Sequence, residues 1–476
     1  MMNRRSFIKS TATAGGLMLL PSWSIGKQIA PNSKINVAVI GVGGIGGYSN
    51  FRLLKNKYCK VVALCDVDDV RASKQYKKFP ASTPKFRDYR VMFDKMGKQI
   101  DAVVISTPDH MHYPISAWAI ANGKHVFCQK PLTRTIWEAN ELQRLSSQAG
   151  VITQMGNQGH TKDGWRVVKE WYEAGIIGQI KEVHIWTNRP IWPQGELQMP
   201  SAQPIPSTLD YNCWLGVAPH QPYNKAIVPF NWRGLRNYGT GAAGDMAIHY
   251  LDIPYSAFEL GFPYKIIGNS TPFNDYSWPA QASSTMTFLN KRGVDGKIML
   301  HWYDGGRKPK SIERVDKSFL EDKRNDNAIF IVGTKETVYV GGDCQSPKIF
   351  PLTRMKELVK NGIISKQQMQ LKYFDDPIAE WINGCLTGVN PPASFDYACP
   401  YTEMALLGMV ALCVPNTELK YVPSKMSFIN CPEADKYVRS LYDYRTEFLP
   451  SKLGFSRCGR HKKIPTNCRD FFCVYA

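Results

Sequence analysis

Three residues in the middle of the chain combine acid–base side chains with a regular spacing. Asp245, His249 and Asp252 lie at i, i+4 and i+7, so an α-helix places all three on one face. An imidazole titrates near neutral pH and can take or give a proton, and a nearby carboxylate can orient it. The spacing predicts His249 as a general acid or base oriented by Asp245. An ordinary surface helix can carry the same spacing, so the interpretation depends on the rest of the chain.

A second pattern, near the start of the chain, is typical of dinucleotide binding. Residues 35–40 form a short apolar run, which predicts a strand, and the sequence G-V-G-G-I-G follows at 41–46. Such a loop turns tightly, approaches a pyrophosphate and begins a helix whose N-terminus faces the phosphate charge. The predicted cofactor contacts here are Gly41, Gly43, Gly44, Ile45 and Gly46.

A carboxylate at the end of the next strand suits the ribose of the same cofactor. Asp66 follows the predicted strand 61–65, 20 residues beyond Gly46, where an acid accepts hydrogen bonds from the adenosine ribose. Its charge repels a 2′-phosphate, which favours NAD over NADP, although Arg71 nearby would favour NADP. The sequence therefore predicts NAD as the cofactor.

The elements that hold these residues alternate between strand and helix over the first third of the chain. Further strands are predicted at 101–106, 125–128 and 151–155, and helices from about Gly44 and at 113–122 and 135–148. This alternation predicts a doubly wound α/β domain over 34–155, which binds ligands beyond the carboxyl ends of its strands. The segment 156–160 follows the last strand and is expected to border that cleft.

The next part of the chain changes in composition. Six of the twelve Trp residues lie between 161 and 240, together with polar side chains. Aromatic faces beside planar donors suit sugars, although Trp also packs in cores. Strands are predicted at 182–187, 264–268, 283–289, 297–303, 328–332 and 337–340, and helices at 376–386 and 402–413. The candidate substrate residues are Asn157, His160, Arg189, Trp192, Arg233, Asp245 and His249, with His160 either a second acid–base group or a buried structural histidine.

Several motifs in order resemble those of the glucose-fructose oxidoreductase, inositol dehydrogenase and MocA (Gfo/Idh/MocA) family. They are the glycine loop, Thr107-Pro108 with His112, the stretches 123–126 and 128–132, and a second motif at 244–252. The resemblance spans about 34–430 and implies a Rossmann NAD-binding domain, then an α/β domain with a large, mainly antiparallel sheet over 156–430. In relatives that sheet commonly mediates oligomerisation, so a homo-oligomer, a dimer or a tetramer, is expected.

The resemblance also implies roles for residues between the two motifs. It adds Thr107, Pro108, His112, Gln129 and Lys130 to the cofactor site. Oxidising a carbinol with a nicotinamide needs a base for the hydroxyl proton, which His249 would supply, while Lys130 would stabilise the charge on the oxygen. The family usually has Glu before this lysine, and Gln129 cannot stabilise Lys130 as an anion would.

These features predict a nicotinamide-dependent oxidoreductase acting on a secondary alcohol of a sugar, glycoside or polyol. Two alternatives stay open. Some relatives with bound NAD cleave glycosides by transient oxidation, and a cofactor-binding sensor or scaffold is favoured if Gln129 has disabled the site.

The N-terminus is expected to be an export signal. Arg4-Arg5 and the following Phe-Ile-Lys resemble a twin-arginine signal, and the uncharged stretch 10–26 is too short and polar for a membrane span. Residues 1–30 therefore predict transport of the folded chain to the periplasm by the twin-arginine machinery. An ordinary basic arm is the alternative.

Composition excludes several other classes of protein. The chain has 43% apolar residues and mean hydropathy of -0.30, which excludes a disordered, collagen-like or polytopic membrane protein. Its charge of +19 lies partly at the termini and forms no nucleic-acid-binding signature. The tail 450–476 is expected to be unstructured or atypical, because the spacing of its Cys and His residues fits no zinc module, and no metal is predicted.

Overall fold

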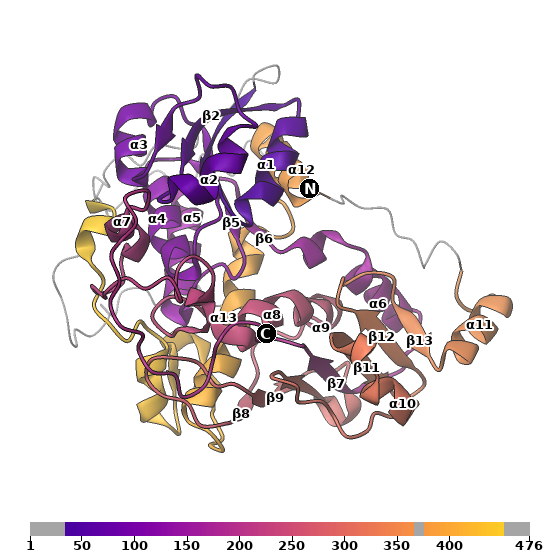
Figure 1. Ribbon diagram of the computed structural model, residues 1–476. Helices are drawn as coiled ribbons and strands as arrows, with labels where there is room; N and C mark the ends of the chain where they lie inside the picture. The colour runs from indigo at the N-terminus through magenta and orange to yellow at the C-terminus, as the bar shows by residue number, and fades with distance from the viewer. Residues whose placement is uncertain (1–33, 366–375, 452–476) are drawn as a thin grey trace, which may run out of the picture.

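The computed structural model describes residues 34–365 and 376–451 (Figure 1). The predicted export signal and almost all of the predicted tail lie outside these residues. Within them, no helix is long and apolar enough to cross a membrane.

The first domain is built on a six-stranded parallel sheet, as predicted. Its strands run in the order β3-β2-β1-β4-β5-β6, and each pairs in parallel with its neighbours. β1 and β4 are central and apolar on both faces, because helices cover the sheet on both sides. The strands are β1 (Ile35–Ile40), β2 (Cys59–Cys65), β3 (Lys85–Phe86), β4 (Ala102–Ile105), β5 (His125–Gln129) and β6 (Thr153–Gly156).

The helices of this domain begin and end where local chemistry favours it. In α5, Thr135 and Glu138 form a reciprocal capping box, and Gly150 ends the helix in the left-handed conformation at φ 62°. α1 begins at Gly46 and not at the expected Gly44, because Gly44 itself has a positive φ of 55°. The helices are α1 (Gly46–Lys55), α2 (Asp69–Tyr76), α3 (Tyr89–Met96), α4 (His112–Ala121) and α5 (Ile136–Ala149), of which α2 and α3, like the short β3, were not predicted.

The second domain contains a seven-stranded sheet in the order β13-β12-β11-β7-β10-β9-β8. β7 and β10 pair in parallel and the other neighbours are antiparallel, which confirms the expected mainly antiparallel sheet. The strands are β7 (Ile180–Trp186), β8 (Lys265–Ser270), β9 (Ala282–Leu289), β10 (Lys297–Tyr303), β11 (Ala328–Gly333), β12 (Thr337–Gly341) and β13 (Lys348–Phe350).

Two helices from the C-terminal part of the chain join the domains. α13 (Phe395–Cys413) contacts both α5 and the strands β8 and β9. α12 (Pro377–Thr387) lies beside α1 (Figure 1), and its Trp381 packs on Phe127 in the core of the first domain. The segment 156–430, expected as one substrate domain, therefore contributes a helix to the dinucleotide-binding domain.

A long irregular segment between β7 and α8 (Gly241–Tyr250) lies over the first domain, and we call residues 197–238 the cover. It contains one short α-helix, α7 (Tyr211–Leu215), a 3-10 helix at Asn231–Gly234, and an apolar cluster of its own. Two backbone hydrogen bonds join it to the chain after β2: Asp210 N–H donates to the Val67 carbonyl at 2.8 Å, and Asp69 N–H donates to the Thr208 carbonyl at 3.1 Å. The cover is therefore anchored directly beside Asp66.

Candidate active site

A cavity of about 390 Å³ lies between the glycine loop and the cover. Seven of the predicted cofactor residues line it: Gly41, Gly43, Gly44, Ile45, Asp66, Thr107 and Pro108. The opposite side comes from cover residues that sequence reasoning did not identify, namely Leu209, Cys213, Trp214, Val228, Pro229, Phe230 and Trp232. The Trp content had marked this segment, but no periodicity indicated where it would fold.

The backbone of the glycine loop requires its glycines. Gly41 has a φ of 83°, and a Cβ there would lie 2.5 Å from the Ser106 carbonyl oxygen. A Cβ on Gly46 would lie 2.1 Å from the Gly41 oxygen, so Gly46 serves the packing of α1 on β1. Among the described residues, the buried hydroxyl oxygens of Ser106 and Thr107 have no hydrogen-bond partner, which leaves them available to a ligand. These features fit a dinucleotide.

Asp66 is held at the edge of the cavity. Its two carboxylate oxygens accept hydrogen bonds from the backbone N–H groups of Gly43, at 2.8 Å, and Asp68, at 3.0 Å. Burial raises the pKa of Asp66, and these hydrogen bonds oppose the rise. Each oxygen keeps a second lone pair, so the carboxylate can still accept ribose hydroxyls.

Four of the predicted cofactor residues do not line the cavity, namely Gly46, His112, Gln129 and Lys130. The ring nitrogens of His112 lie 2.7 Å from the Pro131 oxygen and 2.9 Å from the Thr107 oxygen, so His112 joins the two loops. Gln129 is buried, with its Nε2 3.4 Å from Ser49 Oγ and its Oε1 without a partner among the described residues. Neither side chain is among the residues that line the cavity, and their direct contact with the cofactor stays a prediction.

A compact cluster of charges adjoins the cavity. Oδ1 of Asp245 accepts from Lys130 Nζ at 2.7 Å and lies 2.9 Å from Nη1 of Arg233, which also binds Oδ1 of Asp109 at 3.2 Å. Burial opposes ionisation of Asp245, but Arg233 and Lys130 outweigh it and hold the Asp245 pKa below its usual range. Burial lowers the pKa of Lys130, against the attraction of Asp245. Arg233, expected to bind substrate, instead links the cavity to Lys130.

His249 is oriented by a residue other than the one expected. Its Nδ1 lies 3.1 Å from Oδ1 of Asn157, while Nδ2 of Asn157 donates to the Ile248 carbonyl at 3.0 Å. That donation identifies Oδ1 as the amide oxygen, so Nδ1 of His249 must carry the proton and Nε2 keeps a lone pair. The expected contact with Asp245 is not among the hydrogen bonds of the described residues. Asp245, four residues earlier on the same helix, instead pairs with Lys130 of the first domain and with Arg233.

The same geometry assigns a structural role to Asn157. Its side chain is fully buried, and both amide atoms contact protein, so in this structure it positions His249, while its predicted contact with substrate stays a prediction. Burial, followed by the charge of Lys130, lowers the pKa of His249 to about 3. His249 is therefore neutral at physiological pH and can accept a proton at Nε2.

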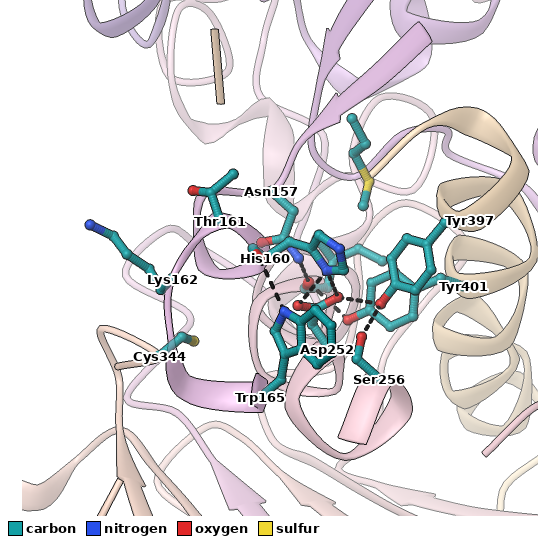
Figure 2. Close-up of polar contacts among 12 residues, drawn as sticks. Asn157, His160, Thr161, Lys162, Trp165, Asp252, Ser256, Cys344, Tyr397 and Tyr401 are labelled. Carbon is teal, nitrogen blue, oxygen red and sulfur yellow. Dashed lines mark hydrogen bonds and ion pairs between the residues drawn. The ribbon is translucent and has the colours of Figure 1, made fainter. Parts of the chain in front are cut away.

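His160 is part of a second buried network, shown in Figure 2. Its Nδ1 lies 3.0 and 3.1 Å from the two oxygens of Asp252, and Tyr397 donates to that carboxylate at 2.5 Å. The ring stacks on Trp165, and only 2% of His160 is exposed. The helix expected across Asp245–Asp252 breaks at Leu251, which turns Asp252 towards His160. Of the two interpretations of His160, the buried structural histidine fits this packing better.

The remaining substrate candidates divide between core and surface. Trp192 is 5% exposed and donates from Nε1 to Gln194 at 2.8 Å, so it packs inside the domain. Arg189 is less buried and lies close enough for its charge to contribute to the lowered pKa of His249. Arg189 is thus the predicted substrate residue that best keeps that role.

The buried histidines predict acid lability. The pKa values of His249 and His110 are both lowered to about 3 by burial, whereas an unfolded histidine titrates near 6.5. Between these values the unfolded chain binds more protons, so the free energy of unfolding falls as the pH falls, by about 1.4 kcal/mol per unit for each histidine. Between pH 7 and pH 5 the free energy of unfolding should decrease in both proteins, and we expect the decrease to be about 2 kcal/mol smaller in His249→Asn than in the wild type. Denaturant midpoints at both pH values measure this, with exposed His220→Asn as control, and an equal loss in all three proteins contradicts it.

Two family models match the chain in the order of its domains. Residues 35–157 match the NAD-binding Rossmann fold of the Gfo/Idh/MocA oxidoreductase family, and residues 170–259 match its C-terminal α/β domain. The two segments are thus similar to the NAD-binding and C-terminal domains of oxidoreductases of this family.

Curated relatives align over part of their length. Inositol 2-dehydrogenase of Salmonella typhimurium is 27% identical over 153 residues, which are 32% of this chain and 45% of that protein. A glycosyl hydrolase family 109 protein of Solibacter usitatus is 34% identical over 160 residues, or 30% of this chain and 36% of that protein. The chain thus spans less than half the length of either relative.

Solved structures share the fold over most of the chain. The WlbA dehydrogenase from Chromobacterium violaceum, in complex with NADH and UDP-GlcNAcA, has a TM-score of 0.58 at 16% identity and covers 83% of this chain and 98% of that one. The aldose-aldose oxidoreductase from Caulobacter crescentus, complexed with glycerol, has a TM-score of 0.55 at 14% identity, with 81% and 99% covered. At such identities the likeness shows the fold alone.

Proposed function

We propose that the protein is an exported, NAD-dependent oxidoreductase that transfers hydride between a tightly bound nicotinamide and a secondary alcohol of a sugar, glycoside or polyol. One observation carries the proposal. The cavity over the glycine loop is bordered by Arg233, whose guanidinium shares a single oxygen of Asp245 with Lys130. The dinucleotide cavity therefore meets the cluster of acid–base groups, as hydride transfer requires.

The residues of the chain have complementary tasks in this reaction. When bound, NAD supplies the hydride acceptor for the carbinol carbon. His249, neutral and protonated at Nδ1, accepts the hydroxyl proton at Nε2. The ammonium group of Lys130 stabilises the negative charge that develops on the oxygen. Asp245, itself paired with Arg233, holds Lys130 in place, and Asn157 holds the ring of His249.

Lys130 has a counter-ion although Gln129 stands where the family usually has Glu. Asp245 lies 2.7 Å from the ammonium group and supplies the negative charge. This supports a working catalyst over the inactive sensor or scaffold.

A redox-neutral glycoside-cleaving enzyme is the second candidate. The similarity to a glycosyl hydrolase family 109 protein favours it, and so does the cover, since an enclosed cofactor is most simply restored by its own substrate. Incubating sugars and glycosides with purified protein, while following cofactor absorbance and product release together, tests both. Net cofactor reduction supports the first function, and hydrolysis without net reduction supports the second.

Export and assembly are the finer parts of the proposal. The twin-arginine-like segment supports export to the periplasm by the twin-arginine machinery. Leu289 and Met299 on the second sheet are 63% and 42% exposed, which supports a homo-oligomer.

The choice of dinucleotide follows from Asp66. Its buried carboxylate is aimed into the cavity, so NAD is expected to bind at least tenfold more tightly than NADP, and Asp66→Ala to reduce this preference. Titrating cofactor-free protein with both dinucleotides measures it. Arg71 also lines the cavity, and its side chain contacts the glycine loop. A preference for NADP would mean that Arg71 outweighs Asp66.

A further inference from the structure

A groove of about 840 Å³ lies in the second domain, where the chain leaves β7 and where residues 306–326 connect β10 to β11. Its sides carry five cations and two anions. The cations are Arg307, Lys308, Lys310, Lys317 and Lys323, and the anions are Glu321 and Asp326. The groove therefore has an excess of three positive charges.

The pairing of these groups leaves free cations in the groove. Lys308 is neutralised by Asp326 at 2.9 Å, and Lys317 pairs with Glu321 at 3.3 Å on α10 (Lys317–Glu321). The side-chain hydrogen bonds of Arg307 among the described residues go to neutral groups, including Asn269 Oδ1 at 2.8 Å, and its charge also acts on the buried carboxyl of Asp304. Lys310 and Lys323 are exposed and make no ion pair within the described part of the chain. The unbalanced charge thus lies on three side chains that point to the same groove.

The groove includes residues next in the chain to a residue that acts on His249. Thr187 and Asn188 line it, and the next residue, Arg189, contributes to the electrostatics of His249. The Oγ1 hydroxyl of Thr187 donates a hydrogen bond to Asn327 Oδ1 at 2.7 Å. Gly342 lies between Asn327 and Tyr250. A Cβ on Gly342 would lie 2.9 Å from the Cβ of Asn327 and 3.0 Å from the hydroxyl of Tyr250. A short run of contacts therefore joins the groove to the helix that carries His249.

We infer that this groove binds an anionic part of the substrate, so that the protein acts on sugars or glycosides that carry a carboxylate or a sulfate ester. The inference rests on the proposed function and names the substrate class of the same site. The volume exceeds what one sugar ring needs, so a neighbouring residue of a glycoside can lie in it while the oxidised ring lies at His249. Three unpaired cations favour an anion there and give a neutral sugar no comparable attraction.

The test compares three probes of one sugar: methyl glucoside, methyl glucuronide and methyl glucoside 6-sulfate. Binding is measured by calorimetry on the NAD-loaded protein, and kcat/KM by cofactor absorbance. Lys310→Ala/Lys323→Ala is expected to weaken binding of the charged probes about tenfold and that of the neutral probe less than about twofold. Added salt should weaken the same two probes in the wild type. Whichever charged probe binds more tightly identifies the carboxylate or the sulfate as the preferred group.

The control removes the same charge elsewhere. Lys95→Ala/Lys98→Ala takes two exposed lysines from the first domain and should leave all three probes unchanged. Equal binding of neutral and charged probes, or equal effects of both double variants, overturns the inference. Melting curves check the fold, and Lys310→Gln/Lys323→Gln repeats the test if the alanine variant is unstable. If binding of the charged probes depends on these lysines but no hydride transfer occurs, the result supports anion binding in the groove and counts against the oxidoreductase function. The failure of one claim can therefore be distinguished from the failure of the other.

Discussion

Replacing His249 by alanine is expected to lower turnover of the sugar substrate by about 100-fold to 10,000-fold, the usual range for losing a general acid or base. The same loss is expected for Lys130→Ala, since the charge on the reacting oxygen would lose its ammonium partner. Both groups lie beside the cofactor cavity and not among its lining residues, so NAD affinity should change little. The loss should appear in kcat more than in KM, because these contacts are made chiefly in the transition state.

The structure supplies controls for both variants. In Lys130→Ala, Asp245 keeps its contact with Arg233 at 2.9 Å, so the buried carboxylate is not left alone. His220→Ala removes an exposed imidazole that neither lines the cavity nor joins this cluster of ion pairs, and should keep full activity. Steady-state kinetics, NAD titration and melting temperature are measured on each protein. Near-normal turnover in both variants would place the chemistry elsewhere, and His160 would be the next group to replace.

The parts of the site that could be predicted are contiguous in the sequence. The strand 35–40, the glycine loop and Asp66 lie within 32 residues, and their spacing follows from one strand–helix–strand unit. The structure places them around one cavity as expected. The parallel order of the first sheet was predictable for the same reason, since each strand is followed by a segment long enough to cross over.

The contacts between distant segments could not be predicted. The helical spacing correctly grouped Asp245 with His249, but it could not show that Asp245 faces Lys130 and Arg233 while His249 faces Asn157. A helix pattern tells which residues share a face and not what lies opposite. The cover shows the same limit, because an irregular segment has no period from which its docking could be read.

The tryptophan side chains could either bind a sugar or pack against other side chains, and composition alone does not distinguish the two. Trp192 and Trp214, both from the Trp-rich stretch, are each 5% exposed. The ring of Trp214 packs against Tyr238 at 4.9 Å and lines the cofactor cavity, so it closes over the site of the dinucleotide instead of offering a face to a sugar. Composition predicted the aromatic character of this region, and packing decided its use.

We expect purified protein to carry about one NAD per chain and to keep it through gel filtration. The cover encloses the cavity from the side opposite the glycine loop, and its backbone is hydrogen-bonded to the chain on both sides of Asp68. The cover residues on this side would slow the release of a dinucleotide from the cavity. Free NAD is kept in the cytoplasm, so an exported enzyme that released it would soon be empty. Binding also stabilises the folded chain, by about 4 kcal/mol when the ligand is at a thousandfold excess over its Kd.

The decisive measurement isolates the protein from the periplasm without added NAD, denatures it and assays the released nucleotide. Phe230→Ala opens the cover with little cost to the core, because this cavity-lining side chain is 49% exposed, and should speed NAD release about tenfold. Phe51 on α1 is 51% exposed and does not line the cavity, so Phe51→Ala is the matched control and should keep the wild-type rate. Trp214→Ala should release NAD still faster, since its buried ring anchors α7. Protein that contains far less than one NAD per chain and binds added NAD weakly contradicts the captive cofactor, because a cover that slows release would retain NAD bound before the proposed export.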